Sequence, residues 1–160
     1  MTTEVLNTAE NFNIEFMRKA ILLAKEAFQN HEVPVGAVIV KDFKVIGVGM
    51  NNVISSSSVI GHAEINAIFN AGQAIQNYRL NGCDLYVSLE PCHMCAKAIV
   101  DARINNLFFG ALEPKTGSIV SIDNFLDSEH LNHKVNYSYG YMQSESIDLL
   151  KSFFQSKRLA

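Results

Sequence analysis

The sequence contains Pro91-Cys92-His93-Met94-Cys95 and, about thirty residues earlier, Gly61-His62-Ala63-Glu64, and these two stretches decide what the domain can be. Cys92 and Cys95 are three positions apart, so on a helix both sulfurs lie on one face and can reach a single ion. His62 can add a ring nitrogen as a third ligand. A tetrahedral zinc ion with three protein ligands keeps one position open for water, which is typical of catalytic rather than structural zinc sites. We therefore predict one catalytic Zn2+ per chain, bound by these three residues.

Glu64 follows His62 by two residues and is the predicted proton carrier of this site. Zinc bound by two thiolates and a neutral imidazole is formally neutral, so it should acidify water less than an all-histidine site does. A neighbouring base is therefore useful, and Glu64 is the nearest candidate in the sequence. Without the histidine beside it, Glu64 would be interpreted as an ordinary exposed acid at a helix start.

The composition indicates one compact globular domain. Of the 160 residues, 48% are apolar and 18% are charged, which argues against disorder. The longest apolar run, over 33–40, is too short to cross a bilayer, so no membrane association is expected. Residues 1–13 are polar and acidic and lack the pattern of a secretion signal. Three cysteines, two of them in C-x-x-C, indicate metal binding rather than disulfides, so we expect a reducing, cytoplasmic setting.

Hydrophobic periodicity predicts a three-layer α/β/α fold with a mixed sheet of about five strands. It assigns 1–13 to an N-terminal extension and 14–160 to a single domain. We predict helices over 14–30, 62–72, 92–102 and 145–157, and strands over 37–40, 45–49, 84–89, 106–110 and 134–139. Strand, helix and strand over 84–110 predict a right-handed parallel crossover. We expect a flexible serine-rich loop over 53–60 and burial of Ile65, Ile68 and Phe69 by the second helix.

The pairing of H-x-E with P-C-x-x-C is the signature of zinc-dependent nucleobase deaminases. Within that superfamily the chain resembles the bacterial tRNA-specific adenosine deaminases. The resemblance covers roughly residues 14–158 and rests on EVPVGAV at 32–38, HAEI at 62–65, QNYRL at 76–80, LYVSLEPC at 85–92 and KTG at 115–117. The zinc motif alone indicates the superfamily, and the added blocks, especially that at 77–80, point to the tRNA branch.

The resemblance implies a cytidine deaminase-like fold, a zinc ion on His62, Cys92 and Cys95, and proton transfer by Glu64. It also implies substrate-binding residues: Asn51 and the backbone of Ala63 would hydrogen-bond a flipped-out base, and Val33 and Leu89 would line its pocket. The implied reaction is hydrolysis of adenosine to inosine at the wobble position of a tRNA anticodon, with release of ammonia. Members of this family form homodimers in which the second subunit helps to hold the anticodon loop.

Several residues have more than one interpretation. Lys115, His133 and Lys134 are candidate RNA phosphate contacts, although isolated loop charges are usually only solvated. His93 stands where the family is usually apolar, and we expect it on the surface rather than as a fourth ligand. Glu90 could support the metal-binding loop or take part in the reaction, and the sequence leaves both readings open.

Two other functions fit parts of the same pattern. One is a deaminase of a free base, nucleoside or nucleotide, such as guanine or deoxycytidylate. It would use the same chemistry, and only the entrance of the pocket would differ. A non-catalytic zinc-bearing subunit that only helps to bind RNA would be expected to lack the proton-carrying carboxylate, and Glu64 is present. The net charge of −3 does not by itself indicate a nucleic-acid partner.

Overall fold

The computed structural model describes residues 11–159, and the predicted extension over 1–13 lies largely outside that range. The last residues of this extension, Phe12 and Asn13, pack onto the domain. The Phe12 ring stacks on Tyr141 with a centroid distance of 3.8 Å, and the Asn13 side chain accepts a hydrogen bond from the Glu15 backbone N–H. Asn13 thereby caps the first helix.

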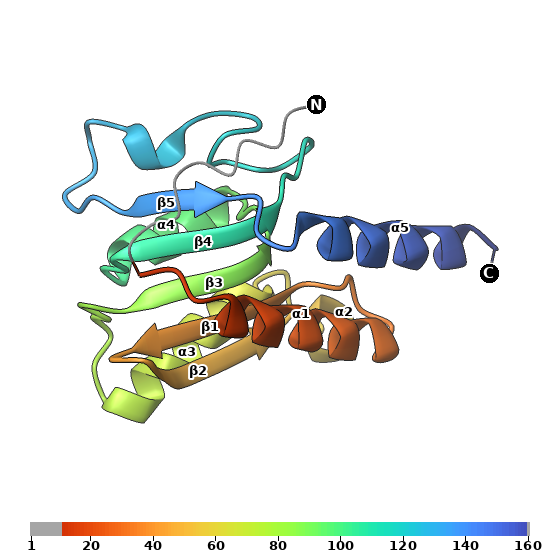
Figure 1. Ribbon diagram of the computed structural model, residues 1–160, viewed down its shortest axis with the longest axis horizontal. Helices are drawn as coiled ribbons and strands as arrows, with labels where there is room; N and C mark the ends of the chain where they lie inside the picture. Colours follow the sequence, from red (N-terminus) through yellow and green to blue (C-terminus); the bar gives the residue numbers. More distant parts are fainter. Residues whose placement is uncertain (1–10, 160) are drawn as a thin grey trace.

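Five strands form one mixed sheet with the order β2-β1-β3-β4-β5 (Figure 1). The strands are β1 Gly36–Lys41, β2 Lys44–Met50, β3 Asp84–Leu89, β4 Asn106–Ala111 and β5 Asn136–Tyr139. Strand β1 pairs antiparallel with β2 and β3, whereas β3, β4 and β5 run parallel. The mixed five-stranded sheet and the parallel crossover between β3 and β4 are therefore confirmed.

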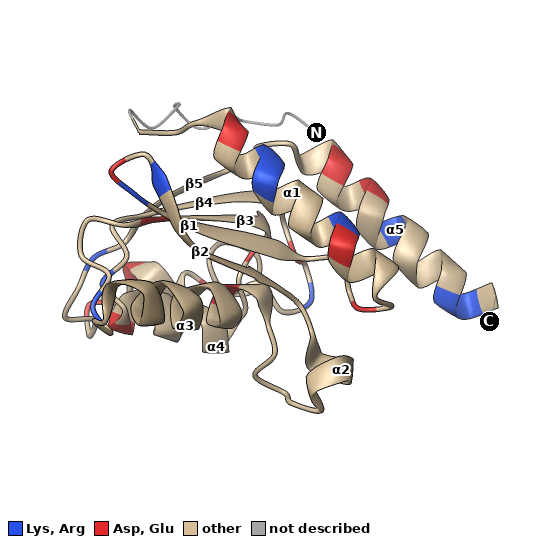
Figure 2. Ribbon diagram, turned by 90° about the horizontal axis from the view of Figure 1, so that it is seen from below, with Lys and Arg blue, Asp and Glu red and all other residues tan. Residues whose placement is uncertain are grey.

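Helices cover both faces of this sheet and complete the predicted three layers. Helices α1 Ile14–Gln29 and α5 Gln143–Leu159 lie side by side on one face, and α3 Ala63–Ile75 and α4 His93–Asp101 lie on the other (Figure 2). Two short helices, α2 Val53–Ser56 and η1 Phe125–Asp127, lie in the connections. No helix between residues 11 and 159 has the length and apolar character needed to cross a membrane.

The prediction of a flexible loop over 53–60 is wrong for its first half, which forms α2. The buried carboxylate of Glu32 accepts hydrogen bonds from the backbone N–H groups of Ile54 at 3.0 Å and Ser55 at 2.7 Å. These are N–H groups of a first helical turn, which have no partner within their own helix. A partner 22 and 23 residues away in the chain therefore orders a segment that has little helical preference of its own.

The packing of α3 on β2 overturns the prediction that Ile65, Ile68 and Phe69 are buried. The face that contacts the sheet consists of alanines with no exposed surface: Ala63, Ala67 and Ala71. Two glycines of β2 make this close approach possible: a Cβ at Gly49 would lie 2.3 Å from the Ala63 carbonyl oxygen, and one at Gly47 would lie 2.6 Å from the Ala71 nitrogen. Because the small residues face inward, Phe69 is left 64% exposed and both isoleucines are only partly buried.

Candidate active site

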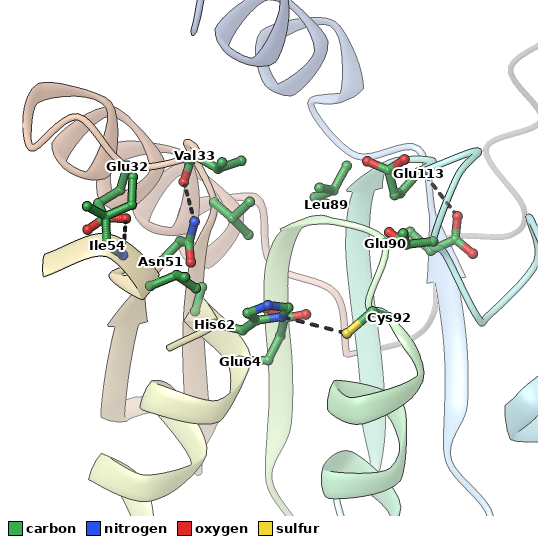
Figure 3. A pocket seen from close by; sticks show the side chains of 14 residues that line it. Glu32, Val33, Asn51, Ile54, His62, Glu64, Leu89, Glu90, Cys92 and Glu113 are labelled. Atoms are coloured by element: carbon green, nitrogen blue, oxygen red, sulfur yellow. Dashed lines mark hydrogen bonds between the residues drawn. The ribbon is translucent and has the colours of Figure 1, made fainter. Parts of the chain in front are cut away.

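Both sequence motifs lie at the N-terminus of a helix, and the two helices bring them together (Figure 3). His62 is the N-cap residue of α3 and Cys92 is the N-cap residue of α4, each with extended backbone angles. Cys92 follows the carboxyl end of β3 by three residues, so the site lies at that end of the parallel strands. Helix N-termini carry partial positive charge, which favours the thiolate form of a cysteine placed there.

The side chains of His62, Cys92 and Cys95 converge on one point. The Nδ1 atom of His62 lies 3.6 Å from the Cys92 sulfur and 3.4 Å from the Cys95 sulfur, and all three ligand atoms lie within 4.8 Å of one another. Zinc–nitrogen and zinc–sulfur bonds of ordinary length in a tetrahedral site place the nitrogen and each sulfur roughly 3.6 Å apart. The separations and the chemistry of the donor atoms therefore fit a zinc ion bound by these residues.

His93 points away from this cluster. Its Nε2 atom lies 2.7 Å from a carboxylate oxygen of Asp123, and both side chains are about half exposed. His93 is therefore the surface histidine that helical geometry predicts, and it does not complete the metal site as a fourth ligand.

The two cysteines have opposite proton affinities. Hydrogen bonds from the Cys95 thiol and from His62 lower the pKa of Cys92 to about 4, against the opposing effect of burial. The same contact with Cys92, together with burial, raises the pKa of Cys95. The pair therefore holds a thiolate at neutral pH, and thiolate is the form in which cysteine binds metals.

Glu64 lies beside the cluster in the first turn of α3 and is only 4% exposed. Burial raises the pKa of its carboxyl group to about 7, although its own backbone N–H and His62 act in the opposite direction. A carboxyl group with a pKa near neutrality can both accept and release a proton. Glu64 thus has the position and the pKa expected of the predicted proton carrier.

A cavity of about 300 Å³ opens over the cluster and is the place for a substrate. The four residues predicted to bind the base all line it: Val33, Asn51, Ala63 and Leu89. His62, Glu64 and Cys92 line it as well. Asn51 is 8% exposed, and its Nδ2 donates to the Val33 carbonyl at 3.3 Å, but its Oδ1 is buried without a hydrogen-bond partner. A buried acceptor without a partner costs about 1–3 kcal/mol, so this oxygen is suited to meeting a donor on a ligand.

Four carboxylates line the cavity, and three of them are bound by backbone N–H groups from other residues. Glu32 accepts from α2, Glu113 accepts from the Lys115 nitrogen, and Glu90 accepts from several residues of the 113–121 loop. In the part of the chain that the structure describes, no such bond from another residue reaches Glu64. Glu64 is therefore the one carboxylate of these four whose oxygens are not taken up by backbone N–H groups of other residues.

The structure separates the three predicted RNA contacts. Lys115 lies on the exposed loop next to Thr116, which lines the cavity. His133 and Lys134 precede β5 at the amino end of the parallel strands, whereas the cavity lies at the carboxyl end. His133 also bonds the Ile104 carbonyl at 2.7 Å through Nε2. Only Lys115 is thus near the pocket, and its contact with RNA stays a prediction.

Sequence reasoning did not single out Glu32, Glu113 or Thr116 as pocket residues. Their places in the wall depend on contacts between distant segments, and no local spacing in the sequence signals them. For Glu90, which the sequence left undecided, the hydrogen bonds to the 113–121 loop favour the supporting role.

Removing either metal-binding sulfur should release the zinc, whereas removing the third cysteine should not. We expect about one zinc per chain in the wild-type protein and in Cys83→Ala, and less than about a tenth of that in Cys92→Ala and Cys95→Ala. Cys83 is a matched control because it is buried yet lies outside the cluster. Metal analysis of purified protein measures this, and full zinc in Cys95→Ala would contradict the proposed ligand set.

Comparison with known proteins agrees with this geometry. Residues 10–111 match the family described as the cytidine and deoxycytidylate deaminase zinc-binding region. A tRNA-specific adenosine deaminase of Aquifex aeolicus is 43% identical over 143 residues, covering 89% of this chain and 94% of that protein. A solved structure from work on A-to-I editing by tRNA:A34 deaminases at the wobble position of transfer RNA is 41% identical, with a TM-score of 0.84, covering 86% of this chain and all of that one.

A more distant match is the X-ray structure of a guanine deaminase from Bacillus subtilis. It is 32% identical with a TM-score of 0.62, covering 93% of this chain and 96% of that one. The fold is thus shared by deaminases named for different substrates. By the extent of these matches, the chain belongs to the zinc-dependent cytidine and deoxycytidylate deaminase family, in the branch of the tRNA-specific adenosine deaminases.

Proposed function

We propose that this protein hydrolyses adenosine to inosine at the wobble position of a tRNA anticodon and releases ammonia. The observation that carries the proposal is the buried Glu64 beside the cluster of His62, Cys92 and Cys95, at the base of a cavity of a size suited to one nucleobase. The similarity to the Aquifex enzyme along nearly the whole of both chains supports tRNA as the substrate. A tRNA substrate and metal-binding thiols both fit a cytoplasmic protein.

The residues of the pocket have distinct roles in this reaction. His62, Cys92 and Cys95 would hold a zinc ion, which would supply the Lewis acidity that makes water nucleophilic near neutral pH. Glu64 accepts a proton from the attacking water and passes protons to the ring nitrogen and then to the departing amine. In the balanced reaction, the oxygen of water replaces the amino group on the ring carbon, and the group leaves as ammonia.

The base is held by groups that lie around the cavity. The free Oδ1 atom of Asn51 accepts a hydrogen bond from the base, and the backbone at Ala63 provides a second polar contact at its edge. The side chains of Val33 and Leu89 pack on the base. The reacting atom of a base inside a stacked helix or loop cannot enter such a cavity, so the nucleotide must be flipped out of its stack.

The guanine deaminase match supports a second candidate, a deaminase of a free purine base. The chemistry would be the same, because the metal ligands and the proton-carrying carboxylate are the parts that such enzymes share. The two functions differ in what surrounds the base: an RNA substrate needs contacts beyond the cavity, whereas a free base needs none.

Direct comparison of substrates separates these two candidates. We expect the zinc-loaded protein to form inosine in an anticodon stem-loop RNA with adenosine at the wobble position, and to convert free adenosine, adenine and guanine at least about a hundredfold less efficiently. Nucleoside analysis of digested RNA and ammonia release measure the two activities. Conversion of a free base or nucleoside at comparable efficiency, with the RNA untouched, would contradict the tRNA assignment.

Replacing the proton carrier should abolish catalysis and leave the metal in place. Glu64→Gln keeps the size of the side chain but cannot carry protons, so we expect about one zinc per chain and a fall in the deamination rate of at least about a thousandfold. Glu129→Gln, at an exposed position away from the cavity, is the matched control. Full activity in the Glu64 variant would show that another group moves the protons.

We also propose that the protein forms a homodimer through the outer face of α3. The only charged residue in this helix is the buried Glu64, so the exposed side carries no charge (Figure 2). That side presents Phe69, which is 64% exposed, and adjoins Tyr78, which is 74% exposed, around a surface hollow of about 730 Å³. Large exposed apolar side chains gathered in one place are typical of interaction sites, and a second copy of the chain is the partner that the family resemblance implies.

A charge placed on this face should separate the two copies. We expect Phe69→Glu to shift the protein from dimer to monomer at micromolar concentration, because an unpaired carboxylate would become buried in the interface. Phe43→Glu is the matched control, since Phe43 is 80% exposed but lies on the turn between β1 and β2. Sedimentation velocity measures the masses, and a Phe69→Glu protein that remains dimeric would exclude this face.

A further inference from the structure

The carboxylate of Glu90 binds one loop at both of its ends. Its Oε1 atom accepts the backbone N–H of Glu113 at 3.0 Å and also the Ser121 hydroxyl. Its Oε2 atom accepts three successive backbone N–H groups at 2.8–3.0 Å, those of Ile119, Val120 and Ser121. The side chain is 3% exposed. A single carboxylate thus closes residues 113–121 into a compact loop.

These contacts need the ionised form of Glu90. Every partner is a donor, and none of the three ion pairs found between residues 11 and 159 includes Glu90. Burial by itself would raise the pKa of Glu90, but the hydrogen bonds from Ser121, Val120 and Glu113 outweigh it and lower the pKa below its ordinary value. The negative charge is therefore stabilised by backbone dipoles rather than by a cation.

The loop that Glu90 binds is one wall of the cavity. Glu113 and Thr116 of this loop line it, and Gly117 packs directly on the Glu90 carboxylate, since a Cβ at Gly117 would lie 2.3 Å from the Glu90 Cδ atom. The adjoining residue Ser118 donates its backbone N–H to the Pro91 carbonyl at 2.9 Å. The wall is therefore attached to the segment that carries Cys92, two residues beyond Glu90.

The opposite side of the cavity is built in the same way. Glu32 is 2% exposed and holds α2 through the N–H groups of Ile54 and Ser55, and both Glu32 and Ile54 line the cavity. Figure 3 shows Glu32 with Ile54 on one side of His62 and Glu90 with Glu113 on the other. Each wall segment is thus fixed by a buried carboxylate that belongs to another part of the chain.

We infer that Glu90 is a positioning residue, whose carboxylate holds the 113–121 loop against the metal-binding segment and so sets the affinity of the pocket for its substrate. Glu90 acts through the loop and does not contact the reacting atoms. Glu32 performs the corresponding role for α2 on the other wall. The kinetic part of this inference rests on the proposed function, because its readout is deamination of the stem-loop RNA.

Glu90→Gln tests the inference because the amide keeps the size of the side chain but turns one of its two acceptor positions into a donor. That donor would face backbone N–H groups, so one end of the loop should be released. We expect KM for the stem-loop RNA to rise about tenfold, with kcat within about threefold of wild type and about one zinc per chain. Hydrogen–deuterium exchange of the 113–121 amides should become faster, while exchange in the sheet stays unchanged.

Other results would overturn the inference. A fall in kcat with unchanged KM in zinc-loaded protein would assign Glu90 to the chemistry. Loss of zinc would assign it to the metal site, and unchanged KM and exchange would show that the loop does not depend on it. Wild-type protein inactive on RNA would contradict only the proposed function, because the exchange measurement needs no substrate and still decides whether Glu90 holds the loop.

Two further variants keep the test usable if Glu90→Gln fails to fold. Ser121→Ala removes one hydrogen bond from the same carboxylate, so a smaller rise in KM, of about two- to fivefold, and faster exchange near residue 121 are expected. Wild-type values for both quantities in this variant would count against the inference. Glu129→Gln removes an exposed charge from the following segment, and it should leave KM, kcat and exchange unchanged.

Discussion

The close packing of α3 on β2 is the contact on which the rest of the site depends. Alanines at 63, 67 and 71 reach the sheet because Gly47 and Gly49 have no side chains, and no larger pair of residues would fit between the two backbones. The same contact fixes the N-terminus of α3, where His62 lies 3.4 Å from the Cys95 sulfur of α4. A shift of α3 outward by the width of one methyl group would separate the nitrogen from the two sulfurs. The metal site is therefore a consequence of how tightly one helix packs on one strand.

The pocket uses its carboxylates in two different ways. Glu32 and Glu90 are buried and have lowered pKa values, so both are ionised. Their oxygens are already engaged in hydrogen bonds from backbone N–H groups. Glu64 is equally buried but has a raised pKa, because burial is not offset by comparable hydrogen bonds. The same residue type thus builds the walls in two places and remains available for proton transfer in a third. The difference comes from the number of donors that the surrounding backbone supplies.

The arrangement of α3 links the catalytic site to the proposed assembly of the protein. Its alanines face the sheet, whereas Phe69 faces away from it and is 64% exposed. An inward face of alanines brings the helix close enough to supply His62 and Glu64. An outward face without charge is what a second copy of the chain could cover. In the proposed homodimer, α3 would therefore serve both purposes with opposite faces.

The sequence by itself determined the order of strands and helices and the mixed three-layer architecture, and it predicted the metal ligands and the proton carrier. These follow from local information: the C-x-x-C spacing on a helix, the H-x-E pair at a helix start and the alternation of strand and helix periods. The tertiary structure alone decided which face of α3 is buried, that residues 53–56 form a helix, that Glu90 supports a wall, and that His133 and Lys134 lie at the far end of the sheet. Each of these depends on partners far away in the chain, namely backbone N–H groups, glycines opposite a helix or the direction of a neighbouring strand. No residue pattern within a single segment carries that information.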